Sequence, residues 1–571
     1  MDQITFLHAS NTTTHIIQCA HVMNLNFQDR CNFIRTTEGC LKNLHYFDYL
    51  NFIFCDVGAT SKNNYFSALF IVFIICLYMF ITLGTTADKF FCPALAVISK
   101  LFGLSENLSG ITLMAFGNGA PDIFTSLFNT EDDTELMYTQ LLGGAVYVTG
   151  FIIGIIMLIY PFNLPKKNYI RDVIFFIISV TFIHNSMHDE FYALNEGIMT
   201  ICIYLLYLIV VIVQHLLMKK KIRDLKNSSR RSSNSTESEA MMKLAEEMEN
   251  FTNIQIRNRR DTTVILNNDI WKVFRRKPDG NPNKDLFIKF IHDINPIKRI
   301  DWNESSFLGT IFIIIKAPIV FILSFIIPLV DYGEDLHGWS KLLNMINVIT
   351  LPQVALLVLG IFKQKIFIYI PLPIIILVIS IAIDVAIYKT SRNDRPPKYH
   401  VIFAAGSFAG SILVIYSVAK EVVSVMTTVA IISDMSDSMV GLSVLAWGNN
   451  IGDTFATIAL AKQGYQQMAF AACFGGPMLN ILLGIGITFI MKGLKSLSNT
   501  AHARGGALGP NCIIFLISIL SFTFFALLLT NFRTRKSIGY FCIIMYATFL
   551  LYCLLGEFEI MHPYGTDHRE T

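Results

Sequence analysis

The chain has 571 residues, of which 53% are hydrophobic and only 15% charged, and its mean hydropathy is +0.51. This composition excludes an ordinary soluble protein and predicts an all-α polytopic membrane protein that crosses the lipid bilayer several times. The net charge of +3 is too small to indicate a nucleic-acid partner.

Residues 1–65 form a polar tail that holds four cysteines, Cys19, Cys31, Cys40 and Cys55. Cysteines clustered in a polar segment favour disulfides in an oxidising compartment, and four cysteines allow about three pairings, which sequence alone does not separate. Neither a signal peptide nor an Arg-rich transit peptide stands out here. The residues alone therefore do not identify the membrane in which the chain resides.

Residues 66–217 carry five apolar segments, each close to the roughly 20 residues needed to cross a bilayer, although the fourth is short. Basic residues follow the third and fifth segments, whereas acidic residues follow the second and fourth. Because loops rich in Lys and Arg stay inside, the polar tail is expected outside. The five segments are 66–84, 108–128, 141–160, 173–184 and 197–217.

One motif occurs twice in the chain. The stretch SENLSGITLMAFGNGAPDIFTS, at 105–126, recurs as SDSMVGLSVLAWGNNIGDTFAT at 436–457. An apolar segment repeated with one acid in each copy is typical of the paired broken helices at the midplane of secondary transporters. Aligned without a gap, the copies match Gly110 with Gly441, Gly117 with Gly448, Asn118 with Asn449, and Asp122 with Asp453.

The two aspartates are the candidate ion ligands, because an ionised Asp near the bilayer centre costs roughly 2.5–3.5 kcal/mol and usually marks a function. Glycine and proline beside each acid, including Gly448 and Gly452, predict that both helices break there. Two carboxylates balance one divalent charge, and amides supply neutral oxygens to calcium, which takes about 6–8 oxygen ligands. The alternative is that the glycines and asparagines only let helices pack closely. The predicted ligands are Asn118, Asp122, Asn449, Asn450 and Asp453.

Residues 218–305 form a long polar loop on the inner side. Its middle predicts disorder followed by a short acidic helix. Arg230 and Arg231 precede Ser233 with the spacing of a basic-directed kinase site, where a phosphate would invert the local charge. A kinase is thus a candidate partner at Ser233, and a solvated linker is the alternative.

Residues 306–398 are accessory hydrophobic segments, and the number of times they cross the membrane decides whether the two repeats are inverted. Inverted repeats need an odd number of crossings between their equivalent helices, so one of the three segments 307–330, 342–362 and 366–388 should not span. Basic residues at both of its ends favour 366–388 as re-entrant or interfacial, with both ends inside. The competing choice is 342–362. The acidic turn with Asp331 and Glu334 is expected outside.

Residues 399–557 restore the five-segment pattern, and residues 558–571 form a short C-terminal tail. The predicted fold is therefore two inverted five-helix repeats, each with a broken ion-binding helix, plus the accessory segments between them. The expected segments are 401–425, the second motif copy, 468–491, 512–530 and 538–556.

The two motif cores, GNGAPDIF and GNNIGDTF, are each followed by a Gly-Gly pair, at 143–144 and 475–476. They resemble the two alpha repeats of the cation/calcium exchanger superfamily. The Asn-x-x-x-Asp form and the run AKQGYQQMAFAACFGGPMLNILLGIG are most similar to its mitochondrial sodium/calcium exchanger branch, also called sodium/lithium/calcium exchangers. The resemblance implies an antiporter that exchanges calcium for sodium, and in that branch lithium, by alternating access, with Asn480 as a further ion ligand. It also implies the mitochondrial inner membrane, with the plasma membrane or an endomembrane as the alternative.

The repeats disagree four residues after each Gly-Gly pair, where the first has Val148 and the second has Asn480. The resemblance implies a cation ligand at this position. One apolar side chain there predicts a site with fewer ligands and less negative charge, unless the neighbouring Thr149 supplies the missing oxygen.

Other function classes fit the sequence features to different degrees. A proton- or potassium-coupled cation exchanger fits the same motifs, while a channel or receptor fits less well, because channels usually assemble by rotation and this chain has an internal pseudo-twofold. The thirteen histidines do not recur at zinc-ligand spacing, and no phosphate-binding glycine loop stands out. The chain is therefore expected to be a transporter without a cofactor rather than an enzyme. Its oligomeric state is not set by the sequence.

Overall fold

The computed structural model describes residues 19, 21–26, 29–37, 40, 47–57, 62–117, 119, 134–187, 191–231, 235–252, 280–283, 285–297, 302, 307–362, 365–366, 370–433, 436, 439–495, 500–502 and 508–558. Within these ranges, ten helices are long and apolar enough to cross a membrane. Large apolar side chains such as Phe70, Ile209 and Val378 are exposed on them, as expected for helices surrounded by lipid.

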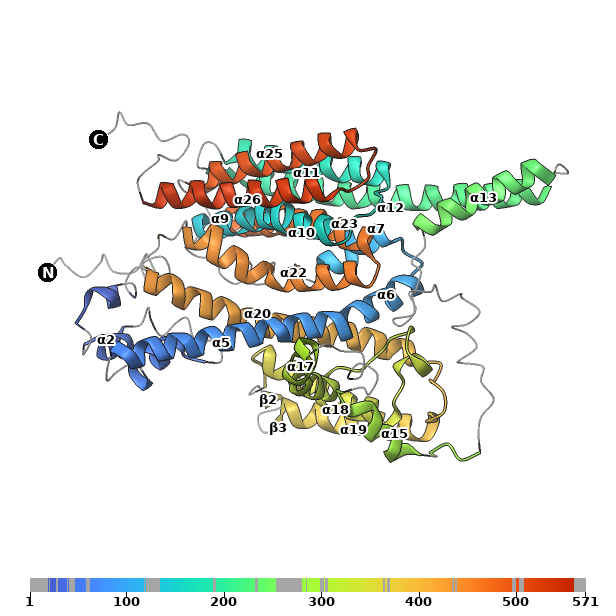
Figure 1. The fold of residues 1–571 in the computed structure, drawn as a ribbon, viewed down its shortest axis with the longest axis horizontal. Helices are drawn as coiled ribbons and strands as arrows, with labels where there is room; N and C mark the ends of the chain where they lie inside the picture. Colours follow the sequence, from blue (N-terminus) through green and yellow to red (C-terminus); the bar gives the residue numbers. More distant parts are fainter. Residues whose placement is uncertain are drawn as a thin grey trace.

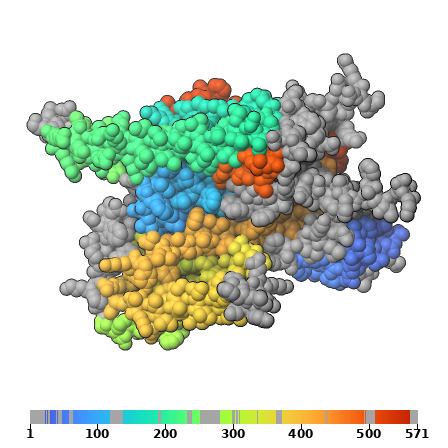
Figure 2. All heavy atoms as spheres, turned by 180° about the vertical axis from the view of Figure 1, so that it is seen from behind, coloured from blue at the N-terminus to red at the C-terminus, as the bar shows by residue number. Residues whose placement is uncertain are grey.

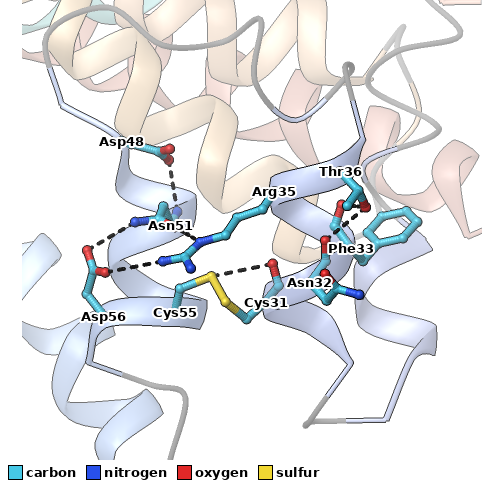
Figure 3. The surroundings of a disulfide bond; sticks show 9 residues. All are labelled: Cys31, Asn32, Phe33, Arg35, Thr36, Asp48, Asn51, Cys55 and Asp56. Carbon is cyan, nitrogen blue, oxygen red and sulfur yellow. Dashed lines mark hydrogen bonds and ion pairs between the residues drawn. A yellow bond between two sulfur atoms is a disulfide. The ribbon is translucent and has the colours of Figure 1, made fainter.

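The N-terminal tail folds into short helices tied by two disulfides, Cys19–Cys40 and Cys31–Cys55. This is one of the three pairings that the sequence left open. Figure 3 shows the second bond joining two of these helices, α2 and η2. The helices are η1 (His21–Asn24), α2 (Arg30–Thr36), α4 (Tyr49–Asn51) and η2 (Phe52–Asp56).

This disulfide-bonded tail, termed the outer cap, packs against the first helix of each repeat. Leu50 and Ile53 share a core with side chains of α5 (Lys62–Thr86) and α20 (His400–Ser433). The Tyr49 hydroxyl donates a buried hydrogen bond of 3.0 Å to Oε2 of Glu421 in α20. Burial and the Glu421 carboxylate raise the pKa of Tyr49, so the hydroxyl keeps its proton and remains a donor.

The first repeat consists of five helical units, three of which include a π-helical stretch. Ser105 accepts a hydrogen bond from the backbone N–H of Leu108 and caps the motif helix at its start. The units are α5–η3–α6 (Lys62–Thr86, Ala87–Phe91, Cys92–Leu101), α7–η4 (Glu106–Ser109, Gly110–Met114), α9–η5–α10 (Thr134–Val146, Tyr147–Ile152, Ile153–Ile159), α11 (Lys166–Ser186) and α12 (Leu194–Arg231).

The loop after the first repeat starts as a helical hairpin. α12 and α13 (Ser235–Thr252) project together beyond the bundle, as Figures 1 and 2 show, and Lys226 pairs with Glu249 at 2.6 Å between them. α13 is the short acidic helix expected from the sequence. Ser233 lies outside the described residues, and a second short helix, α15 (Leu286–Ile294), follows in the loop.

The accessory segments contain a helical hairpin between the repeats. Lys341, at the start of α18, donates hydrogen bonds to the carbonyls of Tyr388 and Ser391 at the end of α19. Gln353 donates to Pro373 near the other end, so the two helices run antiparallel. The elements are α17 (Phe307–Ile326), η6 (Asp335–Gly338), α18 (Lys341–Val358), the paired strands β2 (Lys365–Ile366) and β3 (Ile370–Pro371), and α19 (Leu372–Thr390).

The prediction that 366–388 is re-entrant with both ends on one side is therefore wrong. The basic residues that suggested it flank α19 at opposite ends of the hairpin. α18 and α19 return the chain to the end where α20 begins. The odd number of crossings that inverted repeats need therefore leaves α17 as the segment that does not span the membrane. In Figure 1, α17 runs obliquely to α5 and α20.

The expected side of the acidic turn is also wrong. Tyr332 and Trp339 pack with Val97 and Ile98 near the end of α6, which is the end from which the α12–α13 hairpin projects. Lys and Arg orient membrane segments, whereas Asp and Glu contribute little. The acidic residues of this turn are therefore a weak indicator of the side of the membrane on which it lies, and the prediction relied on them too heavily.

The second repeat has the same five units, and its π-helical stretches fall at equivalent places. In the aligned copies, η4 matches η7 in the motif helices, and η5 matches η8 in the helices that follow. The β1 strand (Phe191–Ala193) and β4 (Thr500–His502) pair antiparallel across the repeats. The units are α20 (His400–Ser433), η7–α22 (Val440–Leu445, Ala446–Lys462), α23–η8–α24 (Gln466–Leu479, Asn480–Ile485, Gly486–Lys495), α25 (Gly509–Leu529) and α26 (Lys536–Glu557).

The two repeats are inverted with respect to each other. The first motif helix, α7, begins at the end where α12 leaves the bundle, and the Gly103 carbonyl just before it accepts a hydrogen bond from Lys219 of α12. The second motif helix begins after α20 has reached the outer cap. Figure 1 places these two starts at opposite ends of the bundle.

The repeats also interlock. α9 of the first repeat packs on η7 of the second, and α23 of the second packs on η4 of the first. A Cβ added at Gly143 would lie 2.6 Å from the Leu442 carbonyl oxygen, and one at the equivalent Gly475 would lie 2.7 Å from the Ile111 Cα. Small residues at these crossings let the backbones touch. The centre of the molecule is thus built from both motif copies.

A buried ion pair anchors the inner end of the first motif helix. Arg171 and Asp172 of α11 have side chains only 8% and 3% exposed, with 2.6 Å between Nη2 and Oδ1. Arg171 also donates to Asn107 of α7 at 2.8 Å and to Gln214 of α12 at 2.7 Å, and Tyr207 donates to Asp172 at 3.0 Å. Three helices therefore meet in one polar network.

We expect Arg171→Met to destabilise the protein, because it leaves the Asp172 charge buried without its cation, at a cost of about 3–5 kcal/mol. Thermal unfolding in detergent should show a clearly lower Tm. The control is Lys226→Met, which breaks a pair with side chains 36% and 37% exposed and worth roughly 0–1 kcal/mol. Equal Tm values for the two variants would contradict the anchoring role.

Candidate ion-binding site

The second motif copy presents its candidate ligands along α22. Asn449 and Asp453 lie four residues apart and therefore share one face of the helix. Both are half-buried, whereas Asn450 is buried. Among the described residues, no three His, Cys, Asp or Glu side chains gather as a transition-metal site. The donors here are amides and a carboxylate, which suit a hard cation such as calcium.

The predicted break at Gly448 and Gly452 is wrong. α22 continues as an α-helix through both glycines, and the interruption lies one turn earlier, in the π-helical η7. The glycines instead serve packing: a Cβ at Gly448 would lie 2.7 Å from Val423 of α20, and one at Gly452 would lie 2.9 Å from Ile415. For these two positions the close-packing alternative is correct.

In the first copy, Asn118 and Asp122 lie outside the described residues. Their neighbour Gly119 is described and buried, and it faces Asn480 of the second repeat. A Cβ on Gly119 would collide with Oδ1 of Asn480, the first residue of η8, whose side chain is 7% exposed. The first motif helix and Asn480, predicted independently as site components, therefore meet.

A second contact of the same kind lies on the other side of the pseudo-twofold. A Cβ added at Gly144 would lie 2.6 Å from Nδ2 of Asn450. That nitrogen donates to the Ala446 carbonyl at 2.9 Å. Within the described part of the chain, Oδ1 of Asn450 receives no hydrogen bond, so this carbonyl oxygen is left for a ligand.

The two contacts are not symmetry equivalents of each other, because they share only one pair of equivalent positions. Asn480 is equivalent to Val148, and Gly119 is equivalent to Asn450. The first crossing pairs Gly119 with Asn480 and the second pairs Gly144 with Asn450, so each brings one amide of the second repeat against the first. Val148 itself offers no side-chain oxygen, and the ligand deficit expected from it stays a prediction. Thr149 is fully buried and donates to its own helix at the Ala145 carbonyl, 2.7 Å away.

Comparison with known proteins identifies the family of the chain. The family model described as "Sodium/calcium exchanger protein" matches residues 72–213 and 403–555. The chain belongs to this family. It is 30% identical to the mitochondrial sodium/calcium exchanger protein of Mus musculus, over 98% of this chain and 93% of that one. It is 29% identical to the protein of the same name from Gallus gallus, over 96% and 92%.

Among solved structures, the exchanger is similar to the sodium-calcium exchanger NCX_Mj. That comparison gives a TM-score of 0.38 and 13% sequence identity, and it covers 83% of this chain and 95% of the other.

Sequence reasoning missed a pair of residues that fixes Asp453 in the exchanger. Thr454, the next residue, donates its hydroxyl proton to the Asn450 carbonyl at 2.9 Å. The Tyr147 hydroxyl, 2.9 Å from Thr454 Oγ1, is therefore the donor in the second bond. The sequence signal that could have found this pair is a difference between the repeats: Tyr147 and Thr454 are polar, whereas their equivalents, Leu479 and Ile123, are apolar.

We expect Gly144→Ala to reduce sodium-dependent calcium flux at least about tenfold, which corresponds to roughly 1.4 kcal/mol. The new Cβ would meet Asn450 Nδ2 at 2.6 Å and push the amide out of place. Flux into reconstituted vesicles, normalised to inserted protein, measures this. A second substitution, Asn450→Ser, shortens that side chain while keeping an oxygen and should restore part of the flux.

The matched control is Gly476→Ala at the equivalent position of the other repeat, where a Cβ would find nothing within 4 Å. Its flux should stay near that of the unchanged exchanger. The same loss in both variants, or in neither, would show that clearance for Asn450 is not what matters.

Proposed function

We propose that the exchanger moves calcium against sodium by alternating access, at one site between the two motif helices. The observation that carries the proposal is the pair of contacts Gly119–Asn480 and Gly144–Asn450. Each joins one repeat to the other at a place where an amide oxygen would face a cation. The proposed ligands are Asn118, Asp122, Asn449, Asn450, Asp453 and Asn480.

The charges of this ligand set suit the two ions. Asp122 and Asp453 together balance one calcium ion, and the amides complete its oxygen shell without adding charge. Sodium ions use the same oxygens, so binding of one ion competes with binding of the other and each shifts the population of the two accessible states. In this proposal Tyr147 and Thr454 hold α22 so that Asp453 faces the site.

The comparisons also support a location and a division of the chain. The relatives named above are described as mitochondrial, so we propose the mitochondrial inner membrane, with the outer cap in the oxidising compartment. Lithium is proposed as an alternative to sodium. We further propose residues 66–217 and 399–557 as the transport domain, residues 218–305 as an inner regulatory loop, and residues 306–398 as an accessory module.

Asp122→Asn and Asp453→Asn should each lower sodium-dependent calcium flux at least about tenfold, because each removes one of two balancing charges while keeping size and oxygen. Flux in reconstituted vesicles, with external sodium replaced in turn by lithium, potassium or a proton gradient, measures loss and coupling ion together. The control is Asp384→Asn in α19, another buried acid but one outside the repeats. Unchanged flux in either site variant would refute the ligand assignment.

We also propose that phosphorylation of Ser233 regulates the loop. Ser233 follows the end of α12 in the sequence, and Ser229 and Ser238 of the two neighbouring helices hydrogen-bond at 2.9 Å. A phosphate on Ser233 would add negative charge two residues after Arg231 in the chain. Ser233→Asp should change the flux rate without changing ion selectivity, and Ser233→Ala should not respond to kinase. Equal rates for both variants and the unchanged exchanger under kinase activation would leave the loop a linker.

A further inference from the structure

The short helix α15 near the end of the inner loop is mostly apolar, with Lys289, His292 and Asp293 as its polar residues. Its sequence, LFIKFIHDI, places one set of residues against α18 and leaves another set facing outward. The outward residues Phe287, Ile288 and Ile291 are 70%, 71% and 66% exposed. Three large apolar side chains grouped on one exposed face usually mark a surface that another apolar surface covers. Among the described residues, protein covers only the side of α15 that faces α18 and the residues beside it.

Polar contacts fix α15 and the residues before it to the ends of the accessory helices. Lys289 Nζ donates to the Trp339 carbonyl at 2.7 Å and to the Asn393 carbonyl at 3.1 Å. Asn283 accepts from Lys341 at 2.8 Å, and its own Nδ2 donates to the Tyr388 hydroxyl at 3.2 Å. The outward apolar face is therefore held in one orientation.

These anchors also set the depth of α15. α18 starts and α19 ends at this point, and both are long and apolar enough to span. The outer surface of α19 exposes Val378, Ile381 and Val385, and it continues through Tyr388 to the segment that bears α15. A tyrosine at the end of a span is typical of the membrane–water interface. Figures 1 and 2 show α15, in yellow-green, at the edge of the molecule beside these helix ends.

We propose that α15 lies in the plane of the membrane surface, with Phe287, Ile288 and Ile291 buried at the boundary between headgroups and acyl chains. The exposed Lys389 and Lys398 beside it would attract anionic phospholipid headgroups. The occupant of the apolar face is thus the bilayer itself rather than another protein. Such an anchor ties the end of the inner loop to the accessory module at a fixed depth.

Nitroxide labels in the full-length exchanger test this. Single cysteines replace Ile288 and Phe287, and the control label replaces Asn281, an exposed polar residue a few positions earlier. Cys202 is changed to serine, because the other free cysteines are buried. The protein is reconstituted in vesicles of phosphatidylcholine with an anionic phospholipid, and collisions with oxygen and with a water-soluble nickel chelate are compared.

Labels at 287 and 288 should collide with oxygen more than with the chelate, and the order should reverse at 281. Greater chelate access at 287 and 288 would overturn the proposal. Spin–spin broadening at 288 that disappears on dilution with unlabelled protein would overturn it as well, because a second copy would then cover the face.

Discussion

The structure depends on the close crossing of the two repeats at paired glycines. Gly143 lies against Leu442, and Gly475 lies against Ile111, at distances that leave no room for a side chain. Only this approach brings the second motif copy against the helix that follows the first, and the reverse. Without it, the amides and the carboxylates would sit in separate bundles, each alone in lipid, where an uncompensated charge is costly.

Symmetry at this crossing applies to the backbone more strictly than to the side chains. η4 and η7, and likewise η5 and η8, fall at equivalent places, yet Asn480 stands opposite Gly119 whereas Asn450 stands opposite Gly144. Both amides therefore come from the second repeat and meet glycines of the first. Interlocked repeats permit this, because a ligand lost from one helix can be replaced from the facing helix without altering the backbone.

Composition and the internal repeat were enough to predict the class, the inverted repeats and the contact between the motif regions, because hydropathy and duplicated acids are local signals. The orientation of α19 was not predicted, since basic residues near a helix end do not show which end faces inside when a hairpin returns the chain. The uninterrupted α22 was missed because glycines weaken a helix and also allow close packing, and Val423 decides between these only in three dimensions. The Tyr147–Thr454 bond was missed because it joins residues 307 positions apart, which no local pattern connects.

The outer cap has a mechanical consequence. It shares one core with α5 and α20, which are the leading helices of opposite repeats, and Tyr49 is bonded to Glu421 inside that contact. Sliding α5 past α20 at the outer end would strain the bond between the cap and α20 and expose the shared core. We therefore expect the two helices and the cap to move as one rigid unit. The two disulfides hold the short helices of the cap together. Reducing both disulfides would therefore loosen the contact through which the cap holds the leading helices of the two repeats together.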